Sequence, residues 1–291
     1  MVSHASETVM LFADRLFLSR VGKLELAAAM SGGLTSHVLT SLFGGVVGYN
    51  NAIVAQYYGA GKKQQCVQAT GQAVFLALLS FPLLLGVIPF TRFFFQAIGF
   101  EPKQIAPANT YLQILLLGAV LIVVRMALTG FFAGIGRTKV VMAANITAML
   151  INLPANYLLI FGRAGLPALG IRGAAIGTLC GSFSAFLILF ITYLRVSRSE
   201  EYRGDGQWRY RPAMMKRLLT FGVPAGLEMF LNVGAFNLFV NLMHTYGPDV
   251  AAAVTIAFNW DIVAFIPMLG LGVATTALVA RHIGAGDYEG A

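Results

Sequence analysis

Charged residues and cysteines are scarce in this chain of 291 residues. Only 11% of the side chains are charged, whereas soluble domains carry about 25%. The two cysteines, Cys66 and Cys180, provide neither a disulfide framework nor the spacing of a metal site. These shortages exclude an ordinary soluble domain and a small disulfide-rich secreted domain. Hydrophobic residues make up 57% of the chain and the mean hydropathy is +0.74, which indicates an integral membrane protein.

Sequence signatures of catalysis are also missing. The chain contains no glycine-rich nucleotide loop, no paired nucleophile and base, and no cluster of metal ligands. We therefore expect that it is not an enzyme, uses no ATP directly and binds no cofactor. The net charge of +8 could indicate a nucleic-acid partner, but Lys and Arg in cytoplasmic loops explain it better in a membrane chain. The expected partner is the lipid bilayer, with no nucleic acid.

Long apolar runs divide the chain into candidate membrane spans. An apolar helix of about 20 residues crosses about 30 Å of hydrocarbon. The sequence predicts an all-α protein with eight such helices, at residues 2–19, 33–57, 68–98, 108–133, 139–161, 172–195, 217–245 and 252–281. The breaks between them carry turn residues, as in GAGKKQQ, GFEPK and YGPD.

A short segment occurs twice in the chain. Residues 54–61 read VAQYYGAG and residues 279–286 read VARHIGAG, and at the same spacing Gly45 pairs with Gly270. Such an echo is typical of a duplicated bundle. Six predicted helices separate the copies, and an even number gives both copies the same orientation. We therefore expect parallel repeats, related by an axis along the membrane normal.

The repeat predicts how the chain divides. A complete second copy requires about another 160 residues, so we expect a fragment of a protein with about twelve helices in two six-helix lobes. Residues 1–195 would form the N-lobe with a truncated first helix, residues 196–216 a linker, and residues 217–291 the first two helices of the C-lobe. The alternative is a mature protein of eight helices.

The distribution of Lys and Arg among the loops predicts the orientation in the membrane. These residues are more frequent on the side that holds the GAG loops and the polar stretch from Arg195 to Arg217. We therefore expect a multi-pass protein of a bacterial-type plasma (inner) membrane, with the GAG loops and the linker at 196–216 in the cytoplasm. The linker is interpreted as solvated and close to anionic headgroups, rather than as a partner-binding site.

Polar side chains inside the predicted spans are the candidates for a functional site. A charge at the bilayer centre costs about 2.5–3.5 kcal/mol on insertion scales, so such groups usually face a cavity or a partner. Asp14 lies on the first helix, and Asn152 and Asn156 lie one turn apart on the fifth, on either side of Pro154. A proline frees a backbone carbonyl about one turn earlier. Carboxylate, amide and carbonyl oxygens together suit a hard cation such as sodium.

Other interpretations of these residues stay open. The pocket could hold a proton instead of sodium, because an apolar interior favours the neutral form of a carboxyl group. The two amides could serve only to bond helices to each other. Asp14 could form a simple ion pair with Arg15 at the membrane interface.

A second set of polar residues lies on the first helices of the two copies. Glu7 shares a helix face with Asp14, and Glu228 and Asn232 share a face of the seventh helix. At the spacing of the repeat, Asn232 corresponds to Glu7, as expected for paired sites at a repeat interface. Asp261 on the eighth helix is a further candidate for a cleft residue, with an interfacial position as the alternative.

Six segments carry a resemblance to a known family. They read ADRLFLSRVGKLELAAA, VAQYYGAGKKQQ, GFFAGIGRTKVVMAANITAMLINLPANYLLIFG, LGIRGAAIGT, GVPAGLEMFLNVGAFNLF and TTALVARHIGAGD. On these segments the chain resembles the MATE family, the multidrug and toxic compound extrusion transporters, along essentially all of its length.

The resemblance implies secondary active export of amphiphilic or cationic small molecules in exchange for sodium ions or protons. Asp14 matches the helix-1 carboxylate of the family, and Asn152 and Asn156 match its helix-5 polar pair, of which the second is Asp in some members. Many relatives have Glu where this chain has Asn232, and Glu228, one turn earlier, is the residue that could compensate. We expect a monomer with no bound metal beyond a coupling sodium ion.

Two other functions stay open from the sequence. A lipid-linked sugar flippase of a related superfamily would need a cationic central cavity that meets phosphate, and Arg125 is the candidate for it within a span. Arg125 could instead extend to the cytoplasmic side or pair with an acid. A truncated, non-functional product is the other alternative.

Overall fold

All regular secondary structure in the described part of the chain is helical, which confirms the predicted all-α class. The computed structural model describes residues 2–97, 102–203, 208–244, 268 and 270–291, and gives the backbone alone for 2–5, 7–8 and 240–244. Its helices are α1 (Val2–Val21), α2 (Lys23–Gly48), α3 (Asn50–Gly59), α4 (Lys63–Val87), η1 (Ile88–Phe90), α5 (Thr91–Ala97), α6 (Pro102–Leu117), α7 (Ala119–Gly134), α8 (Thr138–Phe161), α9 (Ile171–Ser197) and α10 (Pro212–His244). The backbone is helical again over residues 270–285.

Five helical segments of the described residues are long and apolar enough to cross a membrane, or six if the bent pair α6 and α7 counts as one span. The five are Lys23–Gly59, Lys63–Ala97, Thr138–Phe161, Ile171–Ser197 and Pro212–Phe239. Together these six correspond to the predicted spans from 33–57 to 217–245. Helix α1 coincides with the predicted span at 2–19 but is not among them, because charged residues lower its hydropathy. Most of the predicted span at 252–281 lies outside the described residues.

The predicted span at 108–133 is not a straight helix. It is broken at Gly118, and α6 and α7 meet there at 48°. A Cβ at Gly118 would collide with the Cδ atoms of Leu179 on α9, so a larger residue at position 118 would require the Leu179 side chain to move. Because of the break, α6 packs mainly against α2, whereas α7 packs against α3 and α4.

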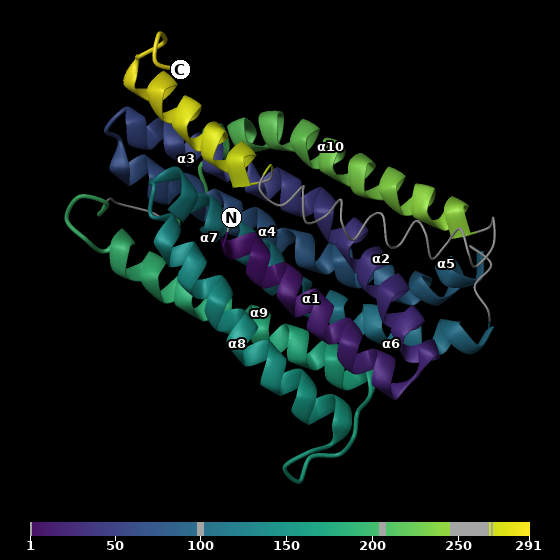
Figure 1. The fold of residues 1–291 in the computed structure, drawn as a ribbon. Helices are drawn as coiled ribbons and strands as arrows, with labels where there is room; N and C mark the ends of the chain where they lie inside the picture. The colour runs from purple at the N-terminus through teal and green to yellow at the C-terminus, as the bar shows by residue number, and fades with distance from the viewer. Residues whose placement is uncertain (1, 98–101, 204–207, 245–267, 269) are drawn as a thin grey trace.

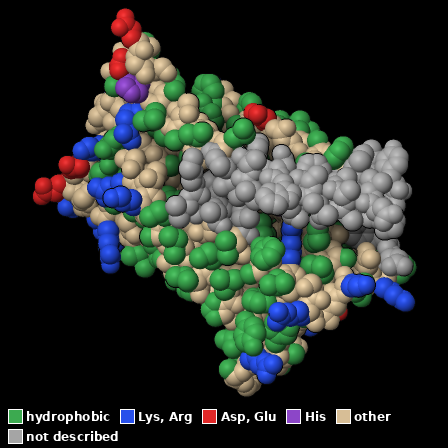
Figure 2. Space-filling view, viewed as in Figure 1, with side chains coloured by type: hydrophobic (Ala, Val, Ile, Leu, Met, Phe, Trp, Pro, Cys, Tyr) green, Lys and Arg blue, Asp and Glu red, His purple; other side chains and the backbone are tan. Residues whose placement is uncertain are grey.

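Long helices packed side by side build the molecule (Figure 1). Helix α8 lies against both α9 and α1, and α10 lies along α2. One buried apolar cluster is centred on Phe131 of α7 and Tyr193 of α9, and another on Leu112 of α6. Figure 2 shows apolar side chains across the middle of one face, with Lys and Arg mainly at its ends. This distribution is expected of a protein that spans a membrane.

The two copies of the repeated segment pack against each other. The first copy ends α3, and the second lies in the helical stretch at 270–285. A Cβ on Gly59 would collide with the carbonyl of Arg281, and a Cβ on Gly284 would collide with the carbonyl of Gln56. Since Gly59 corresponds to Gly284 and Gln56 to Arg281, the contact is reciprocal. The alanines between the segments form a small buried cluster of Ala52, Ala55, Ala277 and Ala280.

The ends of α9 and α10 lie close to the boundaries of the predicted linker at 196–216. Helix α9 ends at Ser197, and α10 begins at Pro212. Proline suits the first position of a helix, because its fixed φ is helical and its missing N–H would have no partner there. The division of the chain into an N-lobe and part of a C-lobe stays a prediction.

Candidate functional site

Asp14 is a buried acid on α1. The residue is 7% exposed, although its neighbour Arg15 is exposed. Asn156 Nδ2 on α8 donates a hydrogen bond to Asp14 Oδ1, and the Thr178 hydroxyl on α9 donates one to Oδ2 at 3.3 Å. The carboxyl group therefore joins three helices, and its hydrogen-bonding partners come from α8 and α9 rather than from Arg15.

The two amides predicted on α8 are both buried, at 0% exposure. Asn156 Oδ1 and both polar side-chain atoms of Asn152 have no hydrogen-bond partner among the described residues. A buried polar atom without a partner costs about 1–3 kcal/mol. Asn156 bonds Asp14 directly and Asn152 lies one turn away on the same helix face, so these atoms indicate a place where water or a cation completes the bonding. Asn156 bonds across helices, as one alternative predicted, but Asn152 does not.

Glycines on α9 let this helix approach α8 closely. Gly173, Gly177 and Gly181 follow each other at intervals of four and therefore lie on one face. At Gly177 an added Cβ would collide with Asn156 Oδ1, and at Gly173 it would lie 2.6 Å from the carbonyl carbon of Leu159. Small residues of this kind allow close contact of helices in membranes. The absence of a side chain at position 177 thus leaves space for the amide of the site.

Pro154 lies on the exposed face of α8, opposite the two amides. Two residues along an α-helix correspond to about 200° of rotation, which separates position 154 from Asn152 and Asn156. The carbonyl that the proline frees lies about one turn earlier, near Leu150, which is also exposed. The prediction that this carbonyl joins the pocket is therefore wrong.

Sequence reasoning missed two residues around Asp14. The first is Thr178, which donates to the carboxyl group and also lies 3.0 Å from the carbonyl of Ala174 on its own helix. The second is the buried Tyr111 of α6, which lies beside Thr178 and Asp14. The available signal for Thr178 was the glycine spacing in LGIRGAAIGT, which predicts a tightly packed helix face.

The described residues of the second predicted set lie apart from the Asp14 site. Glu228 and Asn232 are exposed on α10, which packs mainly along α2, whereas Asp14 is held by α8 and α9. The structure therefore does not bring them together with Asp14. Glu7 lies in α1, but its side chain is outside the described residues, as is the whole of Asp261.

Arg125, the candidate for a phosphate-binding cavity, is directed at α8. Its Nη1 donates to Asn145 Oδ1 at 3.5 Å, and Asn145 is buried. This contact lies between α7 and α8 and gives the flippase alternative no specific support.

A family model named MatE matches residues 1–158 and 224–291, which is more than half of the chain. The chain belongs to the MatE family. The resemblance predicted from the sequence segments is therefore confirmed, and the protein is a multi-pass membrane protein of this family.

Curated relatives of the MatE chain include multidrug resistance proteins. It is 29% identical to the multidrug resistance protein PmpM of Pseudomonas aeruginosa, over 98% of this chain and 60% of the relative. It is also 29% identical to the probable multidrug resistance protein NorM of Geobacillus kaustophilus, over 100% of this chain and 64% of that protein. The chain thus spans less than two thirds of the length of these relatives.

Solved structures show the same fold. A multidrug resistance MATE family transporter in an outward-facing conformation has a TM-score of 0.88 at 22% identity, over 100% of this chain and 64% of that chain. A MOP superfamily transporter from Pyrococcus furiosus has a TM-score of 0.84 at 21% identity, with the same coverage of both chains. At this identity the likeness shows the fold, and it agrees with the predicted membrane bundle.

Proposed function

We propose that this MatE chain is part of a cation-coupled antiporter that exports amphiphilic or cationic small molecules in exchange for sodium ions or protons. The names of its relatives as multidrug resistance proteins support the substrate class. The observation that carries the proposal is the buried Asp14, bonded to Asn156 and Thr178, with unsatisfied amide atoms beside it. The orientation with the GAG loops in the cytoplasm is part of this proposal.

The side chains around Asp14 can hold either coupling ion. For sodium, the carboxylate, the amide oxygens of Asn152 and Asn156, and the hydroxyl oxygen of Thr178 are ligands of the kind that hard cations prefer. For a proton, the carboxyl group becomes a donor, and an amide oxygen that has no partner in the structure can accept from it. Stability in sodium chloride compared with potassium chloride distinguishes the two ions.

Occupancy of the site changes how α1 is held against the bundle. Asp14 belongs to α1, while its bonding partners belong to α8 and α9. An ion shifts the equilibrium between two conformations only by the difference in its affinity for them. We infer that the ion favours one arrangement of α1, and that the exported molecule occupies a cleft between lobes lined by α1 and α10. Glu228 and Asn232, which are exposed on α10, are the described candidates for contact with it.

Ion binding is tested first, on the purified chain in detergent. If sodium is the ion, the melting temperature should be higher in sodium chloride than in potassium chloride at equal ionic strength. At a sodium concentration of 100 times the dissociation constant, the free energy of unfolding should rise by about 2.7 kcal/mol. If the proton is the ion, the two salts should give equal stability and the pH should change it. Asp14→Asn should abolish whichever response the unmodified chain shows.

Glu201→Gln is the matched control for the loss of one acid. Glu201 is exposed, and Lys63 donates to it at 2.8 Å. This bond holds the pKa of Glu201 below its usual range, so the control also removes a negative charge at neutral pH. The control should keep the ion response of the unmodified chain. Transport in proteoliposomes then tests whether a sodium or a pH gradient drives export, and an Asp14→Asn protein with unchanged ion response and transport would remove this site from the proposal.

A further inference from the structure

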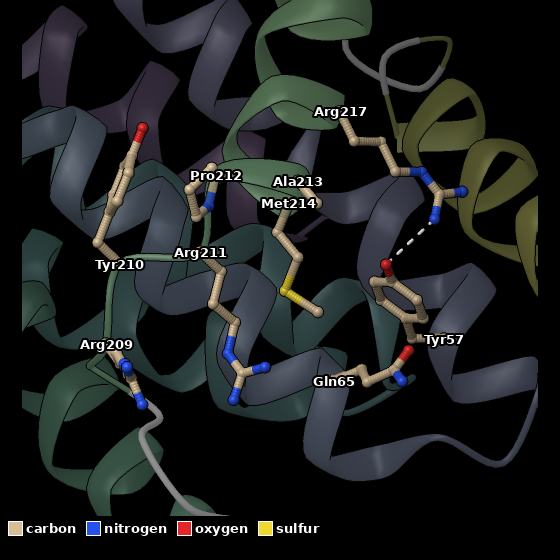
Figure 3. Close-up of a pocket in the computed structure, with 9 residues that line it drawn as sticks. All are labelled: Tyr57, Gln65, Arg209, Tyr210, Arg211, Pro212, Ala213, Met214 and Arg217. Atoms are coloured by element: carbon tan, nitrogen blue, oxygen red, sulfur yellow. Dashed lines mark hydrogen bonds between the residues drawn. The ribbon is translucent and has the colours of Figure 1, made fainter.

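A basic pocket lies where the linker meets the bundle, away from Asp14. It has a volume of about 580 Å³ and is formed by the linker end, the first turn of α10, the end of α3 and the start of α4 (Figure 3). Its lining residues are Tyr57, Gln65, Arg209, Tyr210, Arg211, Pro212, Ala213, Met214 and Arg217. Three of these described residues are arginines, and their positive charges favour an anion.

Arg217 is held in place at one wall of the pocket. Its Nη1 donates to the Tyr57 hydroxyl at 3.2 Å and its Nη2 donates to Gln56 Oε1. The guanidinium also lies 5.3 Å from the centre of the Tyr57 ring. A guanidinium fixed in this way presents its remaining N–H groups in a geometry that suits phosphate.

The backbone that carries the other two arginines is also fixed. Gln72 of α4 is 2% exposed, and both its amide nitrogen and its amide oxygen bond the backbone of the linker. Gln72 Nε2 donates to the Arg209 carbonyl at 2.9 Å, and the Arg211 N–H donates to Gln72 Oε1 at 3.0 Å. Between them, the Tyr210 ring packs on Phe75 of α4, with ring centres 5.7 Å apart. The backbone at Arg209 and Arg211 is therefore held in place before any ligand arrives, which reduces the cost of binding.

The pocket lies at the boundary between membrane and water. Three candidate spans begin or end there, namely Lys23–Gly59, Lys63–Ala97 and Pro212–Phe239. The N-terminus of α10 adds backbone N–H groups and the positive end of the helix dipole. From Tyr210, the α4 surface continues through Phe75 to Leu79, which are 49% and 55% exposed. An anion thus meets the arginines beside an apolar surface that can accept acyl chains.

We propose that this pocket binds the phosphate group of an anionic phospholipid. The arginines would hold the phosphodiester, and the acyl chains would lie along the exposed side chains of α4. The ligand class follows from three cations, a fixed backbone and an adjoining apolar face in one place. This inference goes beyond the proposed transport function and concerns a different part of the chain.

The experiment measures lipid binding to the full chain by native mass spectrometry and thermal stability. Short-chain phosphatidylglycerol should bind and raise the melting temperature, while phosphatidylcholine and inorganic phosphate should do so at least about tenfold more weakly. Arg209→Gln with Arg211→Gln should weaken phosphatidylglycerol binding by about tenfold or more, because charge-assisted bonds to phosphate are lost. Arg163→Gln with Arg172→Gln is the matched control, since both arginines are exposed, Arg163 in the loop after α8 and Arg172 in the first turn of α9.

Several outcomes would overturn the proposal. Equal binding of phosphatidylglycerol and phosphatidylcholine would show that no anionic headgroup is recognised. Inorganic phosphate that binds as tightly as the lipid would indicate a free-anion site, and equal losses in the pocket and control variants would indicate a diffuse charge effect. Arg209→Gln alone keeps the test valid if the double variant does not fold, because Arg209 is exposed and the single change should still weaken lipid binding measurably.

Discussion

Thr178 is the residue of the Asp14 site with a choice of partners. Its hydroxyl lies 3.3 Å from Asp14 Oδ2 and 3.0 Å from the carbonyl of Ala174. A hydroxyl has one hydrogen to donate, so it can serve only one of these acceptors at a time. When it donates to its own helix, its oxygen is free to face a cation at Asp14. Thr178 can therefore adapt to either state of the site without moving α9.

Thr178→Val should weaken cation binding by about 5- to 10-fold, which corresponds to a net hydrogen bond of about 1–1.4 kcal/mol. The fold should be kept, because valine has nearly the same shape. The measurement is a titration of the melting temperature with the coupling ion. Thr147→Val on α8 is the matched control, since among the described residues its hydroxyl bonds the Ala143 carbonyl of its own helix alone, at 2.9 Å. Equal losses in both variants would give Thr178 a packing role alone.

The sequence singled out Asp14 and Asn156, which are in contact in the structure, but it did not single out Thr178. An acid or an amide in an apolar span is conspicuous, because burying it is costly. A threonine can satisfy its hydroxyl within its own helix, so residue type alone does not separate Thr178 from Thr147, and only the glycine spacing beside Thr178 offered a signal. The prediction that Pro154 supplies a carbonyl to the pocket was wrong, because Pro154 lies between the two amides in sequence but on the opposite face of the helix.

Among the helices, the lengths were easier to predict than the breaks and contacts. Hydropathy places α8 at residues 139–161, and the structure has it at Thr138–Phe161. The break at Gly118 was not predicted, because a single glycine in an apolar run is ordinary and gives no sign of a change in helix direction. The close contact of α8 and α9 depends on which glycines face a neighbour.

Gly177→Ala should disturb both this contact and the site. The new Cβ would collide with Asn156 Oδ1 and lie 3.0 Å from the Asn156 backbone nitrogen, so α9 or the amide must shift. Overpacking of this kind costs about 1–3 kcal/mol. We expect a lower melting temperature and a weaker response to the coupling ion.

Gly86→Ala on α4 is the control for this variant, because nothing lies within 4 Å of the added Cβ. It should leave the stability unchanged or raise it by up to about 1 kcal/mol, since alanine is the better helix former. A folded Gly177→Ala protein with an unchanged ion response would show that the Asn156 amide takes no part in ion binding.

Across the whole molecule, the GAG segments join the beginning of the chain to its end. Their contact is symmetric in shape, but the two copies differ in chemistry. Gln56 accepts a bond from Arg217, whereas the corresponding Arg281 donates to the Gly134 carbonyl at 3.3 Å and lies 4.9 Å from the centre of the Tyr58 ring. The sequence showed the repeat, but only the fold shows that the copies touch.

Gly59→Ala and Gly284→Ala should destabilise the chain by similar amounts, about 1–3 kcal/mol each, because each added Cβ meets backbone of the other copy. The double variant should lose less than the sum, since both changes disrupt one contact. Thermal unfolding measures all three. Gly48→Ala is the control, with nothing within 4 Å of its Cβ. Fully additive losses would mean that the two glycines act in separate contacts.

The reciprocal contact between the GAG segments also bears on stoichiometry. Each segment carries a glycine that contacts a carbonyl of the other segment, and a carbonyl that contacts the glycine of the other segment. The surface of one segment is therefore self-complementary. On a single chain these surfaces meet within the molecule, so their pairing is intramolecular. In the folded chain the two GAG segments therefore occupy each other, and this contact cannot also join the chain to a second copy.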